Sequence, residues 1–399
     1  MKKIKNSFLS LLIISTLWSC SANEVAVEVE LIPLPTEQPS SLPRLTRAPS
    51  GEVYLSWVEK SEDKSTTLKF SQLKEGAWTQ PQIISSGKGW FVNWADFPAL
   101  LVNGEQMAAH WLQKSADGTY DYDVRVTFSS NLGADWSPSV IPHNGQPPAE
   151  YGFVSMLPME EQKTFITWLD GRNTKNEDPD NAMSLRSGIF NKEGTLETDW
   201  ELDHRICDCC QTGAALTSNG PMVVYRDRSE REIRDIYSVR WVNGTWTAPE
   251  PVANDFWEIA GCPVNGPAIA ANGDLVAVAW FTAKGGFPMV KLAFSTDAGA
   301  SFGQPVTVSE GTTNGRVGLT LLEDKTVVVS WMDTKEETAT IQAARYDQQG
   351  ALLKGIQVAQ TSAARASGFP VITSTGNRVY MAWTQVGEKN MVKTAALNF

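Results

Sequence analysis

Long hydrophobic runs are nearly absent from this 399-residue sequence, and the single one stands at the N-terminus. No later segment approaches the roughly 20 apolar residues that a membrane-spanning helix needs. Basic residues are also scarce, with 34 Lys and Arg against 45 Asp and Glu and a formal net charge of -11. Because an acidic chain lacks the basic footprint that nucleic-acid binding requires, we exclude a nucleic-acid partner.

The N-terminal run, MKKIKNSFLSLLIISTLWSC, has lysines before an apolar core too short to span a bilayer, which is typical of a secretion signal. Its end, Leu17 to Cys20, resembles a bacterial lipobox, after which the cysteine becomes a lipidated N-terminus. An ordinary cleaved signal is the alternative. We predict a lipoprotein signal peptide over 1–19, lipidation at Cys20, a tether over 20–24 and one domain over 25–399. The expected location is the bacterial cell envelope, in particular the outer membrane, with membrane contact through the lipid anchor only.

Cysteine is rare, and four residues remain once Cys20 is set aside: Cys207, Cys209, Cys210 and Cys262. In an oxidising compartment an even number favours disulfides. Every complete pairing forces one bridge inside the CDCC run, and the pairing Cys207–Cys210 with Cys209–Cys262 is the least strained. The alternatives are a redox-labile pair and a copper or zinc site built from the thiolates and His204. Apart from this cluster we expect no cofactor.

One pattern recurs along the whole sequence: a turn, a hydrophobic β run and a closing aromatic residue, as in GDLVAVAW at 273–280. The spacings between the closing aromatics are 54, 57, 57, 55, 51 and 52 residues, and these aromatics are Trp57, Trp111, Trp168, Tyr225, Trp280, Trp331 and Trp383. Regular repeats of this length indicate a propeller or a solenoid. We predict an all-β, seven-bladed propeller of four-stranded antiparallel blades, with six blades as the alternative and the closing aromatics in the core.

The last repeat has three predicted strands and lacks its outer one. The segment 25–34 (VAVEVELIPL) alternates apolar and acidic residues as an edge strand does. We predict that this N-terminal strand completes the last blade and closes the ring, which removes the free sheet edges.

Two turns carry a recognisable motif. Segment 295–302 (STDAGASF) matches S-x-D-x-G-x-x-F, and 129–136 (SSNLGADW) has Asn131 in place of the acid. They resemble the Asp box, the repeat of bacterial sialidases and related propellers, and we expect the Asp or Asn side chain to bond amides of its own turn. The stretches RICDCCQT, YRDRSEREIRDIY and GCPVNGP look like those of a bacterial sialidase-like subgroup. This resemblance implies a propeller and a glycan ligand.

Sialidases carry a three-arginine cluster, a tyrosine nucleophile with a glutamate beside it, an aspartate acid/base and an F-R-I-P signature. Here 97–100 (FPAL) stands in a comparable place without an arginine, so no catalytic role is carried over. From the residues themselves, Glu150, Tyr151 and Asp96 are the combination that supplies a base, a nucleophilic phenol and a separate acid. Ordinary solvated loop residues are the alternative.

Loops that join outer to inner strands and second to third strands open on one face of a propeller, and we expect the ligand there. The candidate ligand residues in these loops are Arg172, Arg226, Arg228, Arg316, Trp90, Trp94 and Trp257. Guanidinium groups grip carboxylate, sulfate and phosphate bidentately, and aromatic faces stack on sugars. The alternatives are arginines paired with neighbouring acids and tryptophans packed over the sheet ends.

Together these patterns predict an envelope-anchored, sialidase-like propeller that recognises or hydrolyses an anionic glycan, with an anionic carbohydrate or glycoconjugate as its partner. If the protein is an enzyme, we expect an exo-acting glycoside hydrolase. A non-catalytic binding or scaffold propeller and a thiol-based metal or redox protein of the envelope remain as alternatives. The absent arginine signature favours binding over sialidase activity.

Overall fold

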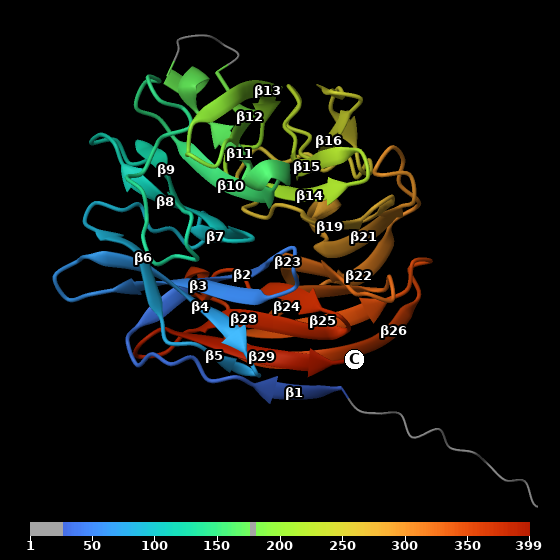
Figure 1. Cartoon of the computed structure of the whole chain (residues 1–399). Helices are drawn as coiled ribbons and strands as arrows, with labels where there is room; N and C mark the ends of the chain where they lie inside the picture. The colour runs from blue at the N-terminus through green and yellow to red at the C-terminus, as the bar shows by residue number, and fades with distance from the viewer. Residues whose placement is uncertain (1–26, 176–180) are drawn as a thin grey trace, which may run out of the picture.

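The computed structural model describes residues 27–175 and 181–399, which form a ring of β-sheets (Figure 1). The predicted signal peptide, Cys20 and the tether over 20–24 lie outside the described residues. The helices in the described part are short 3-10 turns: η1 (Glu160–Gln162), η2 (Arg172–Lys175), η3 (Lys284–Gly286) and η4 (Arg365–Ser367). None of them is long and apolar enough to cross a bilayer.

Seven antiparallel sheets stand around a central axis, and we number them blades 1 to 7 in chain order. Blade 1 contains β2 (Ser40–Arg47), β3 (Val53–Lys60), β4 (Thr66–Lys74), β5 (Ala77–Trp78) and β6 (Gln82–Gly87). Blade 2 contains β7 (Ala99–Asn103), β8 (Gln106–Lys114) and β9 (Tyr122–Ser129). Blade 3 contains β10 (Tyr151–Pro158), β11 (Thr164–Asp170), β12 (Met183–Phe190) and β13 (Leu196–Ile206).

The second half of the ring repeats this plan. Blade 4 contains β14 (Gly213–Thr217), β15 (Gly220–Arg226), β16 (Ile236–Val242), β17 (Thr245–Trp246) and β18 (Glu250–Pro251). Blade 5 contains β19 (Ala268–Asn272), β20 (Leu275–Thr282), β21 (Met289–Ser295) and β22 (Val306–Glu310). Blade 6 contains β23 (Thr313–Leu321), β24 (Val327–Lys335), β25 (Thr338–Tyr346) and β26 (Leu352–Ser362). Blade 7 contains β27 (Val371–Thr375), β28 (Arg378–Gln385) and β29 (Met391–Asn398).

The N-terminal strand closes the ring, as predicted. Strand β1 (Glu28–Leu31) pairs antiparallel with β29 and becomes the outer strand of blade 7. Just beyond it, the Ile32 N–H donates to the Thr394 carbonyl at 2.9 Å. The prediction of seven blades is therefore confirmed, and the six-bladed alternative is wrong.

Two blades depart from the four-stranded plan at their outer edge. In blade 2 the fourth strand is reduced to one bridge between Val126 and Val140, which Pro138 and Pro142 flank. In blade 4 it is the two-residue β18, whose second residue is Pro251. Proline has no N–H to give to the ladder, so these outer segments cannot extend.

The seven closing aromatics all lie in the core on the second strand of their blades, as predicted. Buried indole groups need an acceptor, and several find one two residues further along the strand. Trp168 Nε1 donates to Asp170 Oδ2 at 2.8 Å, and Trp57 Nε1 donates to Glu59 Oε1 at 2.9 Å. Residues two apart share one face of a strand, so this acceptor is buried with its donor.

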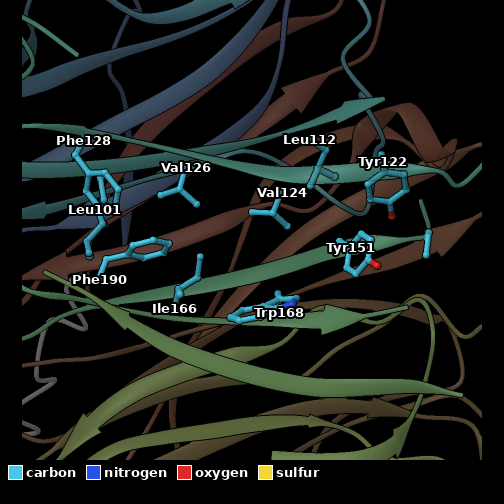
Figure 2. Packing of buried hydrophobic residues seen from close by; sticks show 12 residues of the cluster. Leu101, Leu112, Tyr122, Val124, Val126, Phe128, Tyr151, Ile166, Trp168 and Phe190 are labelled. Atoms are coloured by element: carbon cyan, nitrogen blue, oxygen red, sulfur yellow. The ribbon is translucent and has the colours of Figure 1, made fainter. Parts of the chain in front are cut away.

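Figure 2 shows how blades 2 and 3 pack through interlocking side chains. Phe128 and Phe190 lie at one end of this interface, with ring centroids 5.2 Å apart. Tyr122 and Tyr151, the first residues of β9 and β10, lie at the other end. This tyrosine end faces the loops that join outer to inner strands, and we term that end of the ring the mouth.

The two motif turns follow β9 and β21, at the end of the ring opposite the mouth. Asp297 Oδ1 accepts the Ser301 N–H at 2.9 Å, and Asn131 Oδ1 accepts the Asp135 N–H at 3.0 Å. Gly299 has φ of 80°, a left-handed conformation that glycine adopts without strain. The self-bonded turn expected from the sequence is confirmed.

Candidate functional site

A cavity of about 340 Å³ occupies the axis of the ring, and the inner strands of all seven blades line it. The Gln211 side chain crosses its mouth end. Gln211 Nε2 donates to the Ala95 carbonyl at 2.6 Å, and Gln211 Oε1 accepts the Gly266 N–H at 2.9 Å. These bonds tie the loops that precede β7, β14 and β19 to one another, and so fix the floor of the mouth.

Three aromatic side chains form a continuous surface at the mouth, which we term the aromatic cluster. Trp94 and Phe97 lie in the loop before β7, and Phe369 lies just before β27. The Trp94 and Phe369 rings stack with centroids 5.9 Å apart, and Phe97 packs on Phe369 at the same distance with an interplanar angle of 60°. Since blade 1 stands between blades 7 and 2, the aromatic cluster bridges the mouth end of blade 1.

Three arginines from different parts of the chain surround the aromatic cluster. The guanidinium of Arg44 on β2 lies 4.4 Å from the centroid of the Phe97 ring. Those of Arg316 on β23 and Arg365 on η4 lie 5.0 Å and 5.9 Å from the Trp94 ring. A guanidinium that lies over an aromatic face is stabilised there while its in-plane N–H donors stay available.

None of these three arginines forms an ion pair with a carboxylate in the part of the chain that the structure describes. Arg316 Nη1 donates to Ser367 Oγ at 2.6 Å and to the Gly368 carbonyl at 2.8 Å, which are both neutral acceptors. Burial lowers the pKa of Arg44 and of Arg316 to about 10, so both stay charged at neutral pH. The mouth therefore holds positive charge that its own ion pairs do not neutralise.

Two of the arginines proposed from the sequence are paired internally. Arg172 Nε and Nη2 each donate to an Asp170 oxygen at 2.7 Å. Arg228 Nη2 donates to Glu232 Oε1 at 2.7 Å, and its Nη1 donates to Asp208 Oδ2 at 3.1 Å. Arg172 and Arg228 are thus paired with neighbouring acids, which was the alternative to ligand binding. Neither therefore offers a free guanidinium to a ligand.

Arg226 and Trp257 are buried together between blades 4 and 5. Arg226 is 2% exposed and donates to the carbonyls of Asn265, Arg234 and Phe281 at 2.6 to 3.0 Å. Its guanidinium lies 5.0 Å from the centroid of the Trp257 ring. These contacts join two blades and engage four of the five N–H donors of Arg226.

Trp90 also packs within the fold. Its ring stacks on Trp111 with centroids 5.1 Å apart and an interplanar angle of 15°. Of the three tryptophans expected at the ligand, Trp94 is the one that lies among the unpaired arginines.

Tyr122, Glu150 and Asp96 form a hydrogen-bonded group at the mouth end of blades 2 and 3. The Tyr122 hydroxyl lies 2.9 Å from Glu150 Oε1 and 3.2 Å from Asp96 Oδ2. Asp96 Oδ1 accepts the Phe153 N–H at 2.8 Å. Tyr122 is 1% exposed, and the Phe91 ring covers it with centroids 4.1 Å apart.

Both carboxyl groups of this trio titrate near neutral pH. Burial raises the pKa of Asp96 to about 8 and that of Glu150 to about 7. At neutral pH Asp96 therefore keeps its proton and can donate it to the Tyr122 oxygen, while Tyr122 donates to Glu150. Groups whose pKa lies close to the working pH are suited to general acid–base chemistry.

The structure does not bring Tyr151 into this trio. Its hydroxyl donates to the Pro147 carbonyl at 2.7 Å, and its ring stacks on His143 with centroids 3.6 Å apart. Successive residues of an extended chain point to opposite sides, so the side chains of Glu150 and Tyr151 diverge. In this structure Tyr122, not Tyr151, is the tyrosine that contacts Glu150 and Asp96. The catalytic role expected of Asp96, Glu150 and Tyr151 stays a prediction.

The four cysteines in the part of the chain that the structure describes are free thiols: Cys207, Cys209, Cys210 and Cys262. The Sγ atoms of Cys207, Cys209 and Cys210 lie within 4.8 Å of one another. His204 lies apart from them, largely exposed and 3.8 Å from Asp203. The disulfides expected from the sequence stay a prediction.

Sequence patterns alone did not single out Arg44, Arg365, Phe369 or Tyr122. A signal for Arg44 exists, because Pro43, Pro98 and Pro370 each lie near the mouth end of an inner strand, in blades 1, 2 and 7. Aligned on these prolines, the next residues are Arg44, Ala99 and Val371. Arg44 is thus the position at which one blade replaces an apolar residue by a cation.

No protein-family model matches the sequence, and no curated protein matches it significantly. Solved structures match over nearly the whole chain. A protein of unknown function from Dyadobacter fermentans is 14% identical, with 94% of this chain and 99% of that chain covered and a TM-score of 0.55. An ulvan lyase, described as a polysaccharide lyase, is 10% identical over 92% and 93% of the two chains with a TM-score of 0.53. The microbial sialidase Hz136 is less similar, with 12% identity, coverage of 83% and 73% and a TM-score of 0.47.

At these identities the likeness shows the fold alone. The matches with TM-scores above 0.5 agree with the propeller architecture of the chain. Since one fold hosts many activities, the function has to be argued from the mouth itself.

Proposed function

We propose that this propeller recognises an anionic glycan at its mouth. Arg316 and Arg365, with Arg44 below them, hold the acidic group of the sugar, and the aromatic cluster around Trp94 packs against the sugar ring. The observation that carries the proposal is that three arginines meet one aromatic cluster without a carboxylate partner among the described residues.

The other candidate arginines have different hydrogen-bond partners from the mouth arginines, and this difference supports an acidic ligand at the mouth. Arg172 and Arg228 have carboxylates at 2.7 Å, and the buried Arg226 donates four hydrogen bonds to carbonyl groups. A chain with a net charge of -11 has ample acids to pair every arginine, yet the mouth arginines lie apart from them. Guanidinium groups that keep free N–H donors bind carboxylate or sulfate through paired, charge-assisted hydrogen bonds.

The solved structures that share the fold are consistent with a carbohydrate ligand. One of the polysaccharide lyase structures holds -[GlcA(1-4)Rha3S]-, and its chain is 11% identical with a TM-score of 0.53. Another polysaccharide lyase, Uly1, has a TM-score of 0.50. They support a glycan as the ligand class, and the unpaired arginines of this chain support an acidic one.

The experiment is a screen of the purified full chain against acidic and neutral oligosaccharides of matched length. The acidic set contains sialosides, uronic-acid oligosaccharides and sulfated oligosaccharides, and each is scored for binding and for product formation. We expect binding within the acidic set and none of the neutral counterparts. Equal binding of acidic and neutral sugars, or of neither, contradicts the proposal.

Hydrolysis is the second candidate function, and the trio of Tyr122, Glu150 and Asp96 is the observation that favours it. In that reaction Tyr122 attacks the anomeric carbon as its proton passes to Glu150, and Asp96 gives its proton to the leaving oxygen. Water then attacks the anomeric carbon and releases the sugar from the phenol oxygen. One proton of this water passes to Asp96, and Glu150 returns its proton to Tyr122. Because Tyr122 is 1% exposed, this chemistry requires that Phe91 move away, and for this reason recognition is the primary proposal.

Product formation in the screen separates the two candidates. If turnover is seen, Tyr122→Phe should abolish it and leave binding unchanged, since the phenol touches no mouth arginine. Binding without turnover by the wild-type protein leaves recognition as the function.

We also propose that Cys20 carries a lipid that holds the propeller at the envelope. The lipobox-like run Leu17 to Cys20 supports this anchor. Metabolic labelling with a fatty acid tests it, because Cys20→Ser should lose the label and release the protein from the membrane fraction. Label retained in Cys20→Ser contradicts the anchor.

A further inference from the structure

The CDCC run folds into a turn that brings three thiols into one small space. Cys207, Cys209 and Cys210 have Sγ atoms within 4.8 Å of one another, and the Sγ atoms of Cys207 and Cys210 are 3.3 Å apart. The run stands between β13 of blade 3 and β14 of blade 4. Three sulfur donors from four consecutive residues thus converge on one point.

A fourth thiol, from the next blade, lies beside Cys209. Cys262 lies in the loop before β19 of blade 5, and its thiol interacts with that of Cys209. Cys207 and Cys210 are buried, Cys209 is half-buried and Cys262 is exposed. The cluster is therefore closed on the protein side and open to solvent at Cys262.

One arginine brings positive charge to the sulfur atoms, while Asp208 of the run brings a carboxylate near them. Arg234 Nη1 donates to Cys207 Sγ at 3.3 Å, and Arg234 also bonds Glu232 through Nε and Nη2. Its orientation is thus fixed by a carboxylate that points away from the thiols. An N–H donor held against a sulfur stabilises the thiolate form, which is the form that binds metal ions.

We propose that Cys207, Cys209, Cys210 and Cys262 hold one soft, closed-shell metal ion, copper(I) or zinc(II). Metal–sulfur bonds of about 2.3 Å in a tetrahedron place sulfurs about 3.8 Å apart, which fits the three thiols of the CDCC run, whose Sγ atoms lie within 4.8 Å of one another. Cys262 supplies the fourth donor from its place beside Cys209. A ligand set made only of thiolates selects thiophilic ions over calcium or magnesium. His204, which the sequence offered as a further ligand, lies outside this set because it is largely exposed beside Asp203.

The two metal ions share one ligand chemistry and differ in coordination. Zinc requires four donors and therefore needs Cys262. Copper(I) accepts fewer, so the three thiols of the CDCC run suffice. Loss of Cys262 should weaken zinc binding strongly and copper binding only slightly.

The test uses the full chain isolated under anaerobic conditions. Metal is measured in the protein as isolated, and the metal-free protein then competes with a chromophoric chelator for copper(I) in one arm and zinc(II) in the other. We expect one ion per chain and, for copper, ultraviolet charge-transfer absorption from thiolate to metal. Cys209→Ser should weaken binding of either ion by at least tenfold. Cys262→Ser is the second variant, because Cys262 is exposed and its substitution should leave folding intact. His204→Ala is the matched control and should bind as the wild type does.

Two results overturn the proposal. One is that the protein is isolated without metal and that its mass is lower by the four hydrogens lost when four thiols form two disulfides. That result would support the pairing expected from the sequence. The other is binding that Cys209→Ser leaves unchanged, since the ion then sits elsewhere.

Discussion

The Arg316 guanidinium lies over the Trp94 ring, 5.0 Å from its centroid, and bonds the neutral oxygens of Ser367 and Gly368. Arg316 itself has φ of 53°, at a break in the register between β23 and β24. A non-glycine residue in this conformation costs free energy that the surrounding structure has to offset. The chain therefore holds a cation at the mouth in a strained position, with no carboxylate paired to it among residues 27–175 and 181–399.

Arg365→Ala should weaken binding of the acidic ligand by roughly tenfold, which corresponds to about 1.4 kcal/mol for one lost charge-assisted contact. Arg365 is exposed, and its described contact is with the Trp94 ring, so folding should be unaffected. The matched control is Arg47→Ala. Arg47 is an exposed arginine at the end of β2 that lies away from the mouth. Calorimetric titration checks both variants, and an equal loss in the two would contradict a specific role for Arg365.

Arg172→Ala should lower stability and leave ligand affinity unchanged. The substitution strips the Asp170 carboxylate, which is fully buried, of its bidentate partner. Removing one partner of a buried ion pair costs roughly 3 kcal/mol. Urea unfolding measures the loss, and Arg172→Lys should recover part of it. A large fall in affinity with intact stability would place Arg172 at the ligand after all.

Asp96→Asn should flatten the pH dependence of stability. The pKa of Asp96 is raised from 3.8 to about 8 in the folded chain, so the folded state binds the extra proton between these values. Stability from this group is full below about pH 4 and falls as the pH rises towards 8, by at most about 1.4 kcal/mol per pH unit. Asparagine stays neutral and still accepts from the Phe153 N–H through its oxygen. Unfolding midpoints at pH 5 and pH 8 should therefore differ less in the variant, and an unchanged difference would remove Asp96 as the cause.

Deletion of residues 27–31 should open the ring. It removes β1, leaves β29 with a free edge and uncovers the core between blades 6 and 7. Exposed edges pair with other chains, so the variant should melt at a lower temperature and self-associate. Deletion of residues 21–25, which has equal length and keeps Cys20, serves as the control. A variant that stays monomeric with an unchanged melting temperature would show that the closing strand is dispensable.

The sequence was sufficient for the architecture because each blade repeats the same local signals. The closing aromatics, the motif turns at 129–136 and 295–302 and the incomplete last repeat each follow from short patterns. Those patterns determine seven blades and the closing strand. What they leave open is the length of the outer strands, which the prolines of blades 2 and 4 shorten.

The sequence indicated which end of the ring forms the mouth. It did not show which of the side chains there are available to contact a ligand. The sequence does not distinguish the candidate arginines Arg172, Arg226, Arg228 and Arg316 from one another. What distinguishes them is which acceptors each guanidinium contacts: carboxylates for Arg172 and Arg228, and neutral oxygens for Arg226 and Arg316. That depends on contacts such as the one between Arg226 and Asn265, which lie 39 residues apart. Tyr122 was missed for the same reason, since its partners Asp96 and Glu150 come from loops on either side of it in the chain.

The most direct test of the central claim is a calorimetric titration of the strongest acidic ligand from the screen, together with its neutral counterpart, against the wild type, Arg316→Lys and Arg172→Ala. We predict that the wild type and Arg172→Ala bind the acidic sugar equally, that Arg316→Lys binds it at least tenfold more weakly and that none binds the neutral sugar. Undiminished binding by Arg316→Lys, or equal affinity for the two sugars, would contradict the account.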